Sequence, residues 1–399
     1  MIFSGRHERR NRENPEVALN GISLFEGGES KISVGPETAQ KLTAVYACIY
    51  VLSSTVAQLP ISVLRKIDGK IAPGSDHPAH YLLREEPNQW QTSYKWRETK
   101  QAHTLGWGNG YSRLVRDRKG ELQGIEACHP KSTQLLRNGD RWIYATCDDD
   151  ERPLAVALED MLHLRALGSN GKEGISPIRQ NAETIGLGLA AVRYGKDFFE
   201  GGGRPTGIVT LKDKLQNGSF QQLQKSVAKL MQSETKTVLL PADLDYKALT
   251  IAPEDALFLE TRKLTRSEIA GMFNIPAHMI NDLEKATFSN ISEQAIQFVR
   301  HSILPWVVNW EQEINRKVFT RAERLAGYYT KFNLAGLLRG TPTERAEFYS
   351  RAIMDGWMTR NEVRAFEDLN PITGLDSMLL SVNSRLIGSD GLPVPVTKD

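Results

Sequence analysis

The segment at residues 44–64 contains no charged side chain, which limits where it can lie in a folded protein. An uncharged run of about 20 residues is long enough to cross a lipid bilayer, so a membrane span has to be weighed. Hydroxyl and amide side chains interrupt the segment, and Pro60 predicts the end of a helix. The apolar residues of this helix recur at helical spacing, at Leu42, Tyr46, Ile49 and Leu52. We therefore predict a buried helix within residues 38–58, a strand at residues 61–65 and no membrane contact.

The composition is that of a folded protein with a near-neutral surface. The chain has 399 residues, of which 40% are hydrophobic, which is enough for a substantial core and suggests about two or three domains. Lys and Arg number 50 and Asp and Glu number 48, so the formal net charge is only +2. Because proteins that grip nucleic acid usually have strongly basic surfaces, tight and static DNA binding is disfavoured.

Signatures of enzymatic or metal chemistry are weak. The chain has 3 cysteines, too widely spaced for a disulfide framework or a zinc site and expected to be buried: Cys48, Cys128 and Cys147. Residues 168–173 have the wrong spacing for a phosphate-binding loop, and His77 and His80 favour a solvated turn over a metal site. We expect no enzyme, no cofactor and no metal; a metal-dependent nuclease or hydrolase is the alternative.

Residues 30–174 combine helical and strand-like patterns. Glycines such as Gly120 and Gly139 separate the strand-like segments in the manner of hairpins and loops. In chain order, the predicted elements are helices at 38–58 and 94–105 and strands at 111–116, 124–128 and 161–166. This order predicts an α+β domain.

The pattern changes at Ser176. Ser176 and Pro177 are a good N-cap and first-turn pair for a helix that continues to about residue 200, where glycines stop it. A second helix is predicted at residues 254–273. Between the two helices, a small β-α-β insertion is predicted, with strands at 207–211 and 237–240 and a helix from Ser219.

A polar stretch at residues 281–289 precedes a long predicted helix. Asn290 and Glu293 form a capping box at its start, and its apolar positions continue to Val318. Pro305 lies inside this helix and is expected to bend its axis, because proline removes a backbone hydrogen bond.

The remaining segments are short elements and chain ends. A strand is predicted at residues 328–333, and Thr341 and Thr359 each begin a short helix with a capping box. Residues 1–29, with arginines and no apolar stretch, predict a flexible arm, and residues 371–399 predict a loose tail.

Five sets of strings occur along the chain in an order typical of one family. They are Thr43-Ala44-Val45-Tyr46-Ala47-Cys48 continuing to Gln58-Leu59-Pro60, Gly207-Ile208-Val209, Phe273-Asn274-Ile275-Pro276, Phe288-Ser289-Asn290 with Glu293-Gln294, and Arg360-Asn361-Glu362-Val363-Arg364. Each string is weak by itself. In this order they resemble the HK97-type portal family of tailed bacteriophages, over nearly the whole chain.

The resemblance implies an α+β portal fold with an α/β wing, a two-helix stem, a small α/β clip, a channel loop with a long kinked helix, and a short helical crown. The implied ranges are an arm at 1–29, the wing at 30–174 with 319–340 returning to it, the first stem helix at 175–202, the clip at 203–252, the second stem helix at 253–275, the channel loop and kinked helix at 276–318, the crown at 341–370 and a tail at 371–399.

The resemblance also implies a function. Portal proteins of this type are dodecameric rings at the unique capsid vertex of the virion, assembled in the host cytoplasm, and they conduct double-stranded DNA without sequence specificity during packaging and ejection. The implied partners are further copies of the chain, the terminase large subunit, the head–tail adaptor, and the major capsid protein or a scaffold. Another phage structural component, such as an adaptor or a minor capsid protein, is the alternative.

The resemblance assigns DNA contact to a channel loop made of Asp282, Leu283, Glu284, Lys285, Ala286, Thr287, Phe288 and Ser289. Candidate channel-lining residues of the second stem helix are Arg262, Lys263 and Arg266, and candidate clip contacts to DNA or a partner are Lys212, Lys214, Lys225 and Lys229. A near-neutral subunit suits sliding, because each phosphate neutralised adds an attraction that movement must break. From the residues alone, an ordinary connecting loop is favoured for 282–290, and a solvated helix face is equally open for Lys225 and Lys229.

Overall fold

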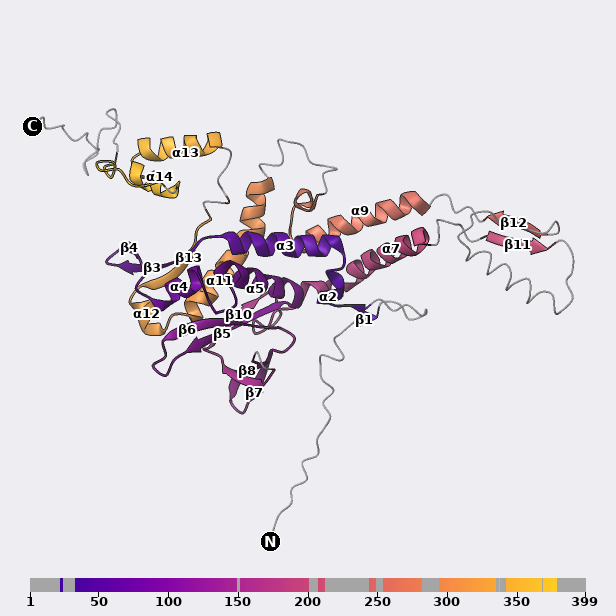
Figure 1. Ribbon diagram of the computed structural model, residues 1–399, viewed down its shortest axis with the longest axis horizontal. Helices are drawn as coiled ribbons and strands as arrows, with labels where there is room; N and C mark the ends of the chain where they lie inside the picture. The colour runs from indigo at the N-terminus through magenta and orange to yellow at the C-terminus, as the bar shows by residue number, and fades with distance from the viewer. Residues whose placement is uncertain are drawn as a thin grey trace, which may run out of the picture. The chain divides into compact units, whose positions relative to one another are not determined.

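The computed structural model describes residues 22–23, 33–148, 151–200, 207–211, 244–248, 254–281, 294–334, 337, 342–367 and 369–378 (Figure 1). The chain forms two compact units. The first consists of Met1–Val51, Ala102–Gly110 and Arg165–Leu283, and the second of Leu52–Gln101, Tyr111–Leu164 and Glu284–Asp399. Both units combine helices with strands, which confirms the predicted α+β class.

The first unit is built around a pair of long helices. These are α7 (Ala182–Glu200) and α9 (Glu254–Met272), and between them in sequence β11 (Gly207–Leu211) pairs antiparallel with β12 (Leu244–Ala248). The short elements of the unit are β1 (Ile22–Ser23), β2 (Ser33–Val34), α2 (Pro36–Ala39), α6 (Pro177–Gln180) and the 3-10 turn η1 (Ala277–Ile280). Helix α3 (Thr43–Gln58) begins in this unit and ends in the second.

The second unit contains three small sheets. One has the order β13-β3-β4, in which β3 (Ile61–Ile67) pairs antiparallel with β4 (Lys70–Pro73) and with β13 (Tyr328–Phe332). The predicted strand at 61–65 therefore exists, and the predicted strand at 328–333 joins it from far along the chain. The other two sheets are β10-β5-β6 and β7-β8-β9, formed by β10 (Met161–Arg165), β5 (Asn109–Arg116), β6 (Leu122–Cys128), β7 (Gln134–Asn138), β8 (Arg141–Cys147) and β9 (Pro153–Ala157).

Helices complete the second unit. They are α4 (Pro78–Arg84), most of α5 (Ser93–Trp107), the π-helical turn η2 (Phe298–Ile303), α11 (Leu304–Lys317), α12 (Arg321–Leu325), α13 (Pro342–Met354) and α14 (Arg360–Phe366). The core lies where α5 meets α11, since the rings of Trp96 and Trp310 pack edge to face with centroids 5.5 Å apart. At α14, Thr359 and Glu362 form the predicted capping box.

Several predictions differ from the structure. The predicted strand at 237–240 lies outside the described residues, so it stays a prediction, and the strand that pairs with β11 is Leu244–Ala248, which was not predicted. Within the expected flexible arm, Ile22 and Ser23 pair with β2, and within the expected loose tail, Ile372 is fixed by two hydrogen bonds with Asn361. Backbone pairing with β2 thus orders Ile22 and Ser23, and hydrogen bonds to the Asn361 side chain order Ile372, although the composition of both segments is typical of chain ends.

Burial also differs at particular residues. Cys147 is exposed, whereas Cys48 and Cys128 are buried as expected, and burial raises the pKa of Cys48 to about 12. Tyr46, which helical spacing placed in the core, is 56% exposed. Among the described helices, none is both long enough and apolar enough to cross a membrane.

Candidate channel and assembly surfaces

Helices α7 and α9, the predicted stem pair, pack closely at Gly188. A Cβ atom on Gly188 would lie 2.8 Å from Cδ2 of Leu42 and 2.9 Å from Cγ2 of Thr265, so this position has no room for a side chain. Buried Ile185 on α7 and Ile269 on α9 continue the apolar contact surfaces of the two helices. The close approach explains why a glycine is tolerated inside a long helix, where it otherwise costs about 1 kcal/mol relative to alanine.

We expect Gly188→Ala to lower the free energy of unfolding by about 1–3 kcal/mol, because the added methyl group forces the side chains of Leu42 and Thr265 to move. The matched control is Gly271→Ala in α9, where a Cβ would meet nothing within 4 Å. The free energy of unfolding of that variant is expected to rise by up to about 1 kcal/mol, because alanine has a higher helix propensity than glycine. Thermal unfolding at one protein concentration measures both, and equal effects of the two variants would contradict the close-packing account.

Two of the three basic residues predicted to line a channel are exposed on α9. Lys263 and Arg266 are exposed, as is Glu268, so the exposed surface carries both signs of charge. The side chain of Arg262 lies outside the described residues. Leu264 is 61% exposed between these charges, because α7 packs on the face that carries Thr265 and Ile269.

The string Phe273-Asn274-Ile275-Pro276 ends α9. Asn274 adopts the left-handed conformation with φ 55°, and its N–H donates to Gly271 O at 3.0 Å. The N–H of Ile275 donates to Ala270 O at 2.9 Å, which completes a Schellman motif with asparagine in the position that usually holds glycine. Asn281, with φ 61°, ends η1 in the same conformation just before the predicted channel loop.

The loop itself and the clip lysines lie outside the described residues. This applies to all of Asp282, Leu283, Glu284, Lys285, Ala286, Thr287, Phe288 and Ser289, and to Lys212, Lys214, Lys225 and Lys229. Asn290 and Glu293, the predicted cap of the long helix, are also outside; the helix is described from Gln294 onward. The roles of these residues remain predictions.

The long helix has an irregular turn where Pro305 was predicted to bend it. Residues 298–303 form the π-helical turn η2, and the N–H of Leu304 donates to Val299 O, one residue farther back than in an α-helix. Pro305 follows at once in the first turn of α11, where its missing N–H is tolerated. The structure thus adds a π turn that the sequence did not indicate, and a bend caused by Pro305 stays a prediction.

Helix α11 is anchored in the second unit by polar contacts in a buried environment. The indole N–H of Trp310 donates to Gln101 Oε1 at 2.8 Å, and Lys100 Nζ lies 5.5 Å from the Trp310 ring centroid. Lys100 Nζ also donates to Leu162 O at 2.6 Å, and Glu313 Oε1 accepts the backbone N–H of His163 at 3.3 Å. Lys100 and Glu313 are both buried, so polar groups as well as apolar packing fix the position of this helix.

A second constrained place is the junction before α6, which we call the stem junction and define by Gly108, Asn109, Gly174 and Ser176. The side-chain amide of Asn109 donates to Gly174 O and accepts from Gly174 N–H, both at 2.8 Å. Ser176 Oγ donates to Gly106 O at 2.6 Å and accepts the N–H of Arg179, as expected for an N-cap. The junction therefore fixes the entry into α6 through hydrogen bonds from the side chains of Asn109 and Ser176 to backbone groups.

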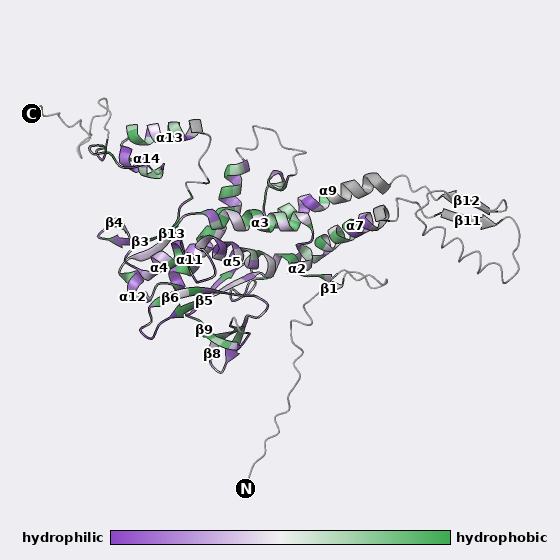
Figure 2. Cartoon of the chain, in the orientation of Figure 1, coloured by the Kyte–Doolittle hydropathy of each residue, from purple (hydrophilic) through white to green (hydrophobic). Residues whose placement is uncertain are grey.

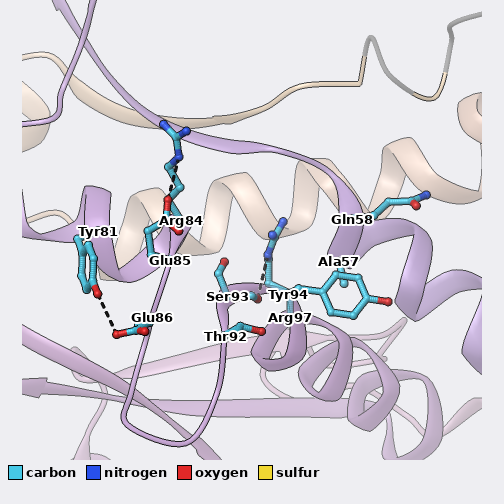
Figure 3. A pocket seen from close by; sticks show the side chains of 10 residues that line it. All are labelled: Ala57, Gln58, Tyr81, Arg84, Glu85, Glu86, Thr92, Ser93, Tyr94 and Arg97. Atoms are coloured by element: carbon cyan, nitrogen blue, oxygen red, sulfur yellow. Dashed lines mark hydrogen bonds and ion pairs between the residues drawn. The ribbon is translucent and has the colours of Figure 1, made fainter. Parts of the chain in front are cut away.

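A cavity of about 510 Å³ in the second unit is lined by the end of α3 and by residues of α4, α5 and the loop between them (Figure 3). Its charged groups are partnered within the cavity wall: Tyr81 donates to Glu86 at 2.8 Å, and Arg84 lies 3.3 Å from Glu85. Arg97 donates to Leu59 O at 2.6 Å, and burial lowers its pKa to about 10. These pairings stabilise the wall and present no nucleophile with a base partner.

Among the described residues, no group of three His, Cys, Asp or Glu side chains could hold a metal ion. The ring of His77, predicted to lie in a solvated turn, is instead buried as the N-cap of α4, where Nδ1 accepts the N–H of Ala79 at 3.0 Å. Packing against Phe319, with ring centroids 5.0 Å apart, accounts for the difference.

Comparisons with known proteins place the chain in a family. The family model described as phage portal protein matches residues 43–368. The portal protein of Enterobacteria phage HK97 is 27% identical over 351 residues, which cover 86% of this chain and 82% of that protein. These matches define the class: the chain belongs to the phage portal protein family, which consists of structural proteins of the virion.

Solved structures show the same fold. A portal protein of the HK97 family from Corynebacterium diphtheriae has a TM-score of 0.58 at 19% identity, covering 77% of this chain and 97% of that chain. A chain in the neck of a native gene transfer agent particle, computed with C12 symmetry, has a TM-score of 0.54 at 19% identity and covers 89% of this chain and 100% of that chain. The fold of this chain is thus similar to that of a solved HK97-family portal protein.

Proposed function

We propose that twelve copies of this chain form a closed ring at the unique capsid vertex, through which double-stranded DNA enters during packaging and leaves during ejection. The observation that carries the proposal is the family match over residues 43–368, which includes the paired helices α7 and α9 and the long helix η2–α11. The relative in a particle neck with C12 symmetry supports the number of copies. The ring is proposed to have no enzymatic activity of its own.

The charge distribution supports a channel that DNA slides through. The formal net charge is +2, and Lys263 and Arg266 are exposed on α9 together with Glu268. A surface of mixed charge binds phosphates weakly, so it adds little of the salt-sensitive attraction that would hold DNA in place. In this proposal α9 lines the channel, and the loop at 282–290 contacts the DNA backbone without reading its sequence.

The remaining parts receive roles from the same proposal. Residues 30–174 with 319–340 form the wing, 175–202 and 253–275 the stem, 203–252 the clip and 341–370 the crown. The clip, with its lysines, binds the terminase large subunit and later the head–tail adaptor, and the wing faces the major capsid protein or a scaffold. Assembly takes place in the host cytoplasm, and the finished ring stays in the virion.

Deletion of residues 282–290 is expected to leave ring assembly intact but to lower the yield of DNA-filled particles strongly, because the channel loses its contact with DNA. Native mass spectrometry measures the ring, and nuclease-protected DNA measures packaging and retention. A same-length Gly/Ser loop serves as the control that separates the side chains from loop length. Rings without a packaging defect would contradict the role of the loop, and the absence of rings from the wild-type chain would contradict the proposed function.

A further inference from the structure

Helix α3 contains no charged residue, yet it exposes two large aromatic side chains to solvent. One face of the helix is buried and includes Val45, Cys48 and Ile49. On another face, in the first half of the helix, Tyr46 and Tyr50 are 56% and 54% exposed, and their rings stack with centroids 6.4 Å apart and an interplanar angle of 6°. Most of the helix is green or pale in Figure 2. A helix face that meets water in the finished assembly normally carries charged residues, and this one has none.

We propose that this outer face of α3, defined by Tyr46 and Tyr50, is a contact surface for a neighbouring copy of the same chain. The inference rests on the proposed function, since the ring supplies the neighbouring copy. It goes further by naming the surface that the ring buries.

The chemistry of the face favours a protein surface as its partner. An uncharged face offers nothing to the phosphates of DNA, because attraction to nucleic acid comes mainly from Lys and Arg. Exposed tyrosines are enriched at protein interfaces, where they supply large contact areas with few rotatable bonds. The stacked arrangement already restricts both rings, so binding costs less side-chain entropy.

Ring symmetry explains why one copy leaves such a face exposed. In a closed ring, each copy uses two different surfaces, one toward each neighbour, and both are exposed in the isolated chain. An apolar face that seems unsuited to a soluble monomer is therefore expected on each side of a ring subunit. The uncharged sequence of α3 fits a helix that is buried on one face by its own chain and on the other face by the next copy.

The first test is the full-length double variant Tyr46→Lys/Tyr50→Lys. It places two like charges one helical turn apart on the contact face, while lysine keeps good helix propensity. We expect ring assembly to require at least about tenfold more protein than the wild type needs, because a buried unpaired charge is costly. Native mass spectrometry and sedimentation velocity measure the rings, and circular dichroism and thermal unfolding establish that the dissociated variant is folded.

Tyr81→Lys is the matched control, because Tyr81 lies on helix α4 and is also 54% exposed. It is expected to assemble like the wild type. Rings of the double variant at wild-type concentrations, or an equal assembly defect in Tyr81→Lys, would overturn the inference.

A second test uses the wild-type chain and does not depend on variants that fold. Oxidative footprinting compares tyrosine modification in the ring and in the dissociated chain. We expect Tyr46 and Tyr50 to be several-fold less reactive in the ring and Tyr81 to be unchanged. Equal reactivity of Tyr46 and Tyr50 in both states would overturn the α3 contact but leave the proposed ring intact, whereas a wild-type chain that never forms rings would overturn both.

Discussion

Gly108→Ala is expected to prevent the chain from reaching a stable fold, with a loss of about 4 kcal/mol or more in the free energy of unfolding. Gly108 has φ +82°, a conformation in which a side chain is strained. A Cβ atom there would also lie 2.5 Å from the carbonyl carbon of Ile175 and 2.6 Å from the nitrogen of Ser176. These are backbone atoms at the stem junction, so the clash cannot be relieved by rotating a side chain.

The control for this prediction is Gly120→Ala. Gly120 has nearly the same φ, +86°, but a Cβ there would meet nothing within 4 Å. It isolates the cost of the left-handed backbone, which is about 1–2 kcal/mol. Soluble yield and thermal unfolding measure both variants. If Gly108→Ala were no worse than Gly120→Ala, the stem junction would be less tightly packed than its contacts indicate.

Trp310→Ala is expected to lower the free energy of unfolding by about 3–5 kcal/mol, because it removes a large buried side chain and leaves a cavity. Trp310 is fully buried, packs on Trp96 and donates to Gln101 Oε1. The substitution also removes the indole N–H that donates to the buried Oε1 of Gln101. We expect the effect to extend to the attachment of α11, which follows the predicted channel loop in sequence.

Trp90→Ala makes the same substitution at a side chain that is 75% exposed. Its effect is expected to stay within about 0.5 kcal/mol. Denaturant unfolding followed by circular dichroism compares the two at one protein concentration, since the stability of an assembly depends on concentration. Comparable losses in both variants would show that Trp310 does not anchor α11.

Predictions that rest on neighbouring residues agreed with the structure. Ser176 caps α6 and Thr359 caps α14 in the way that the sequence indicates, because a cap is decided by a side chain and a backbone N–H a few residues away. The strand after Pro60 and the end of α9 at Asn274 are also decided by residues close by in the sequence. The order of the family strings then predicted the fold of nearly the whole chain, and the order of helices and strands predicted its α+β class.

The sequence by itself thus determined the elements and their family, while the tertiary structure decided their pairing and burial. Nothing in β3 indicates that Val63 pairs with Thr330, and nothing near Asn109 indicates that its amide binds Gly174. Lys100 and Glu313 would be placed at the surface by their charge, yet both are buried because hydrogen bonds satisfy them. Helical spacing placed Tyr46 in a core and cannot distinguish burial within one chain from burial between copies. Periodicity records only that a side chain avoids water, whereas the fold determines what covers it.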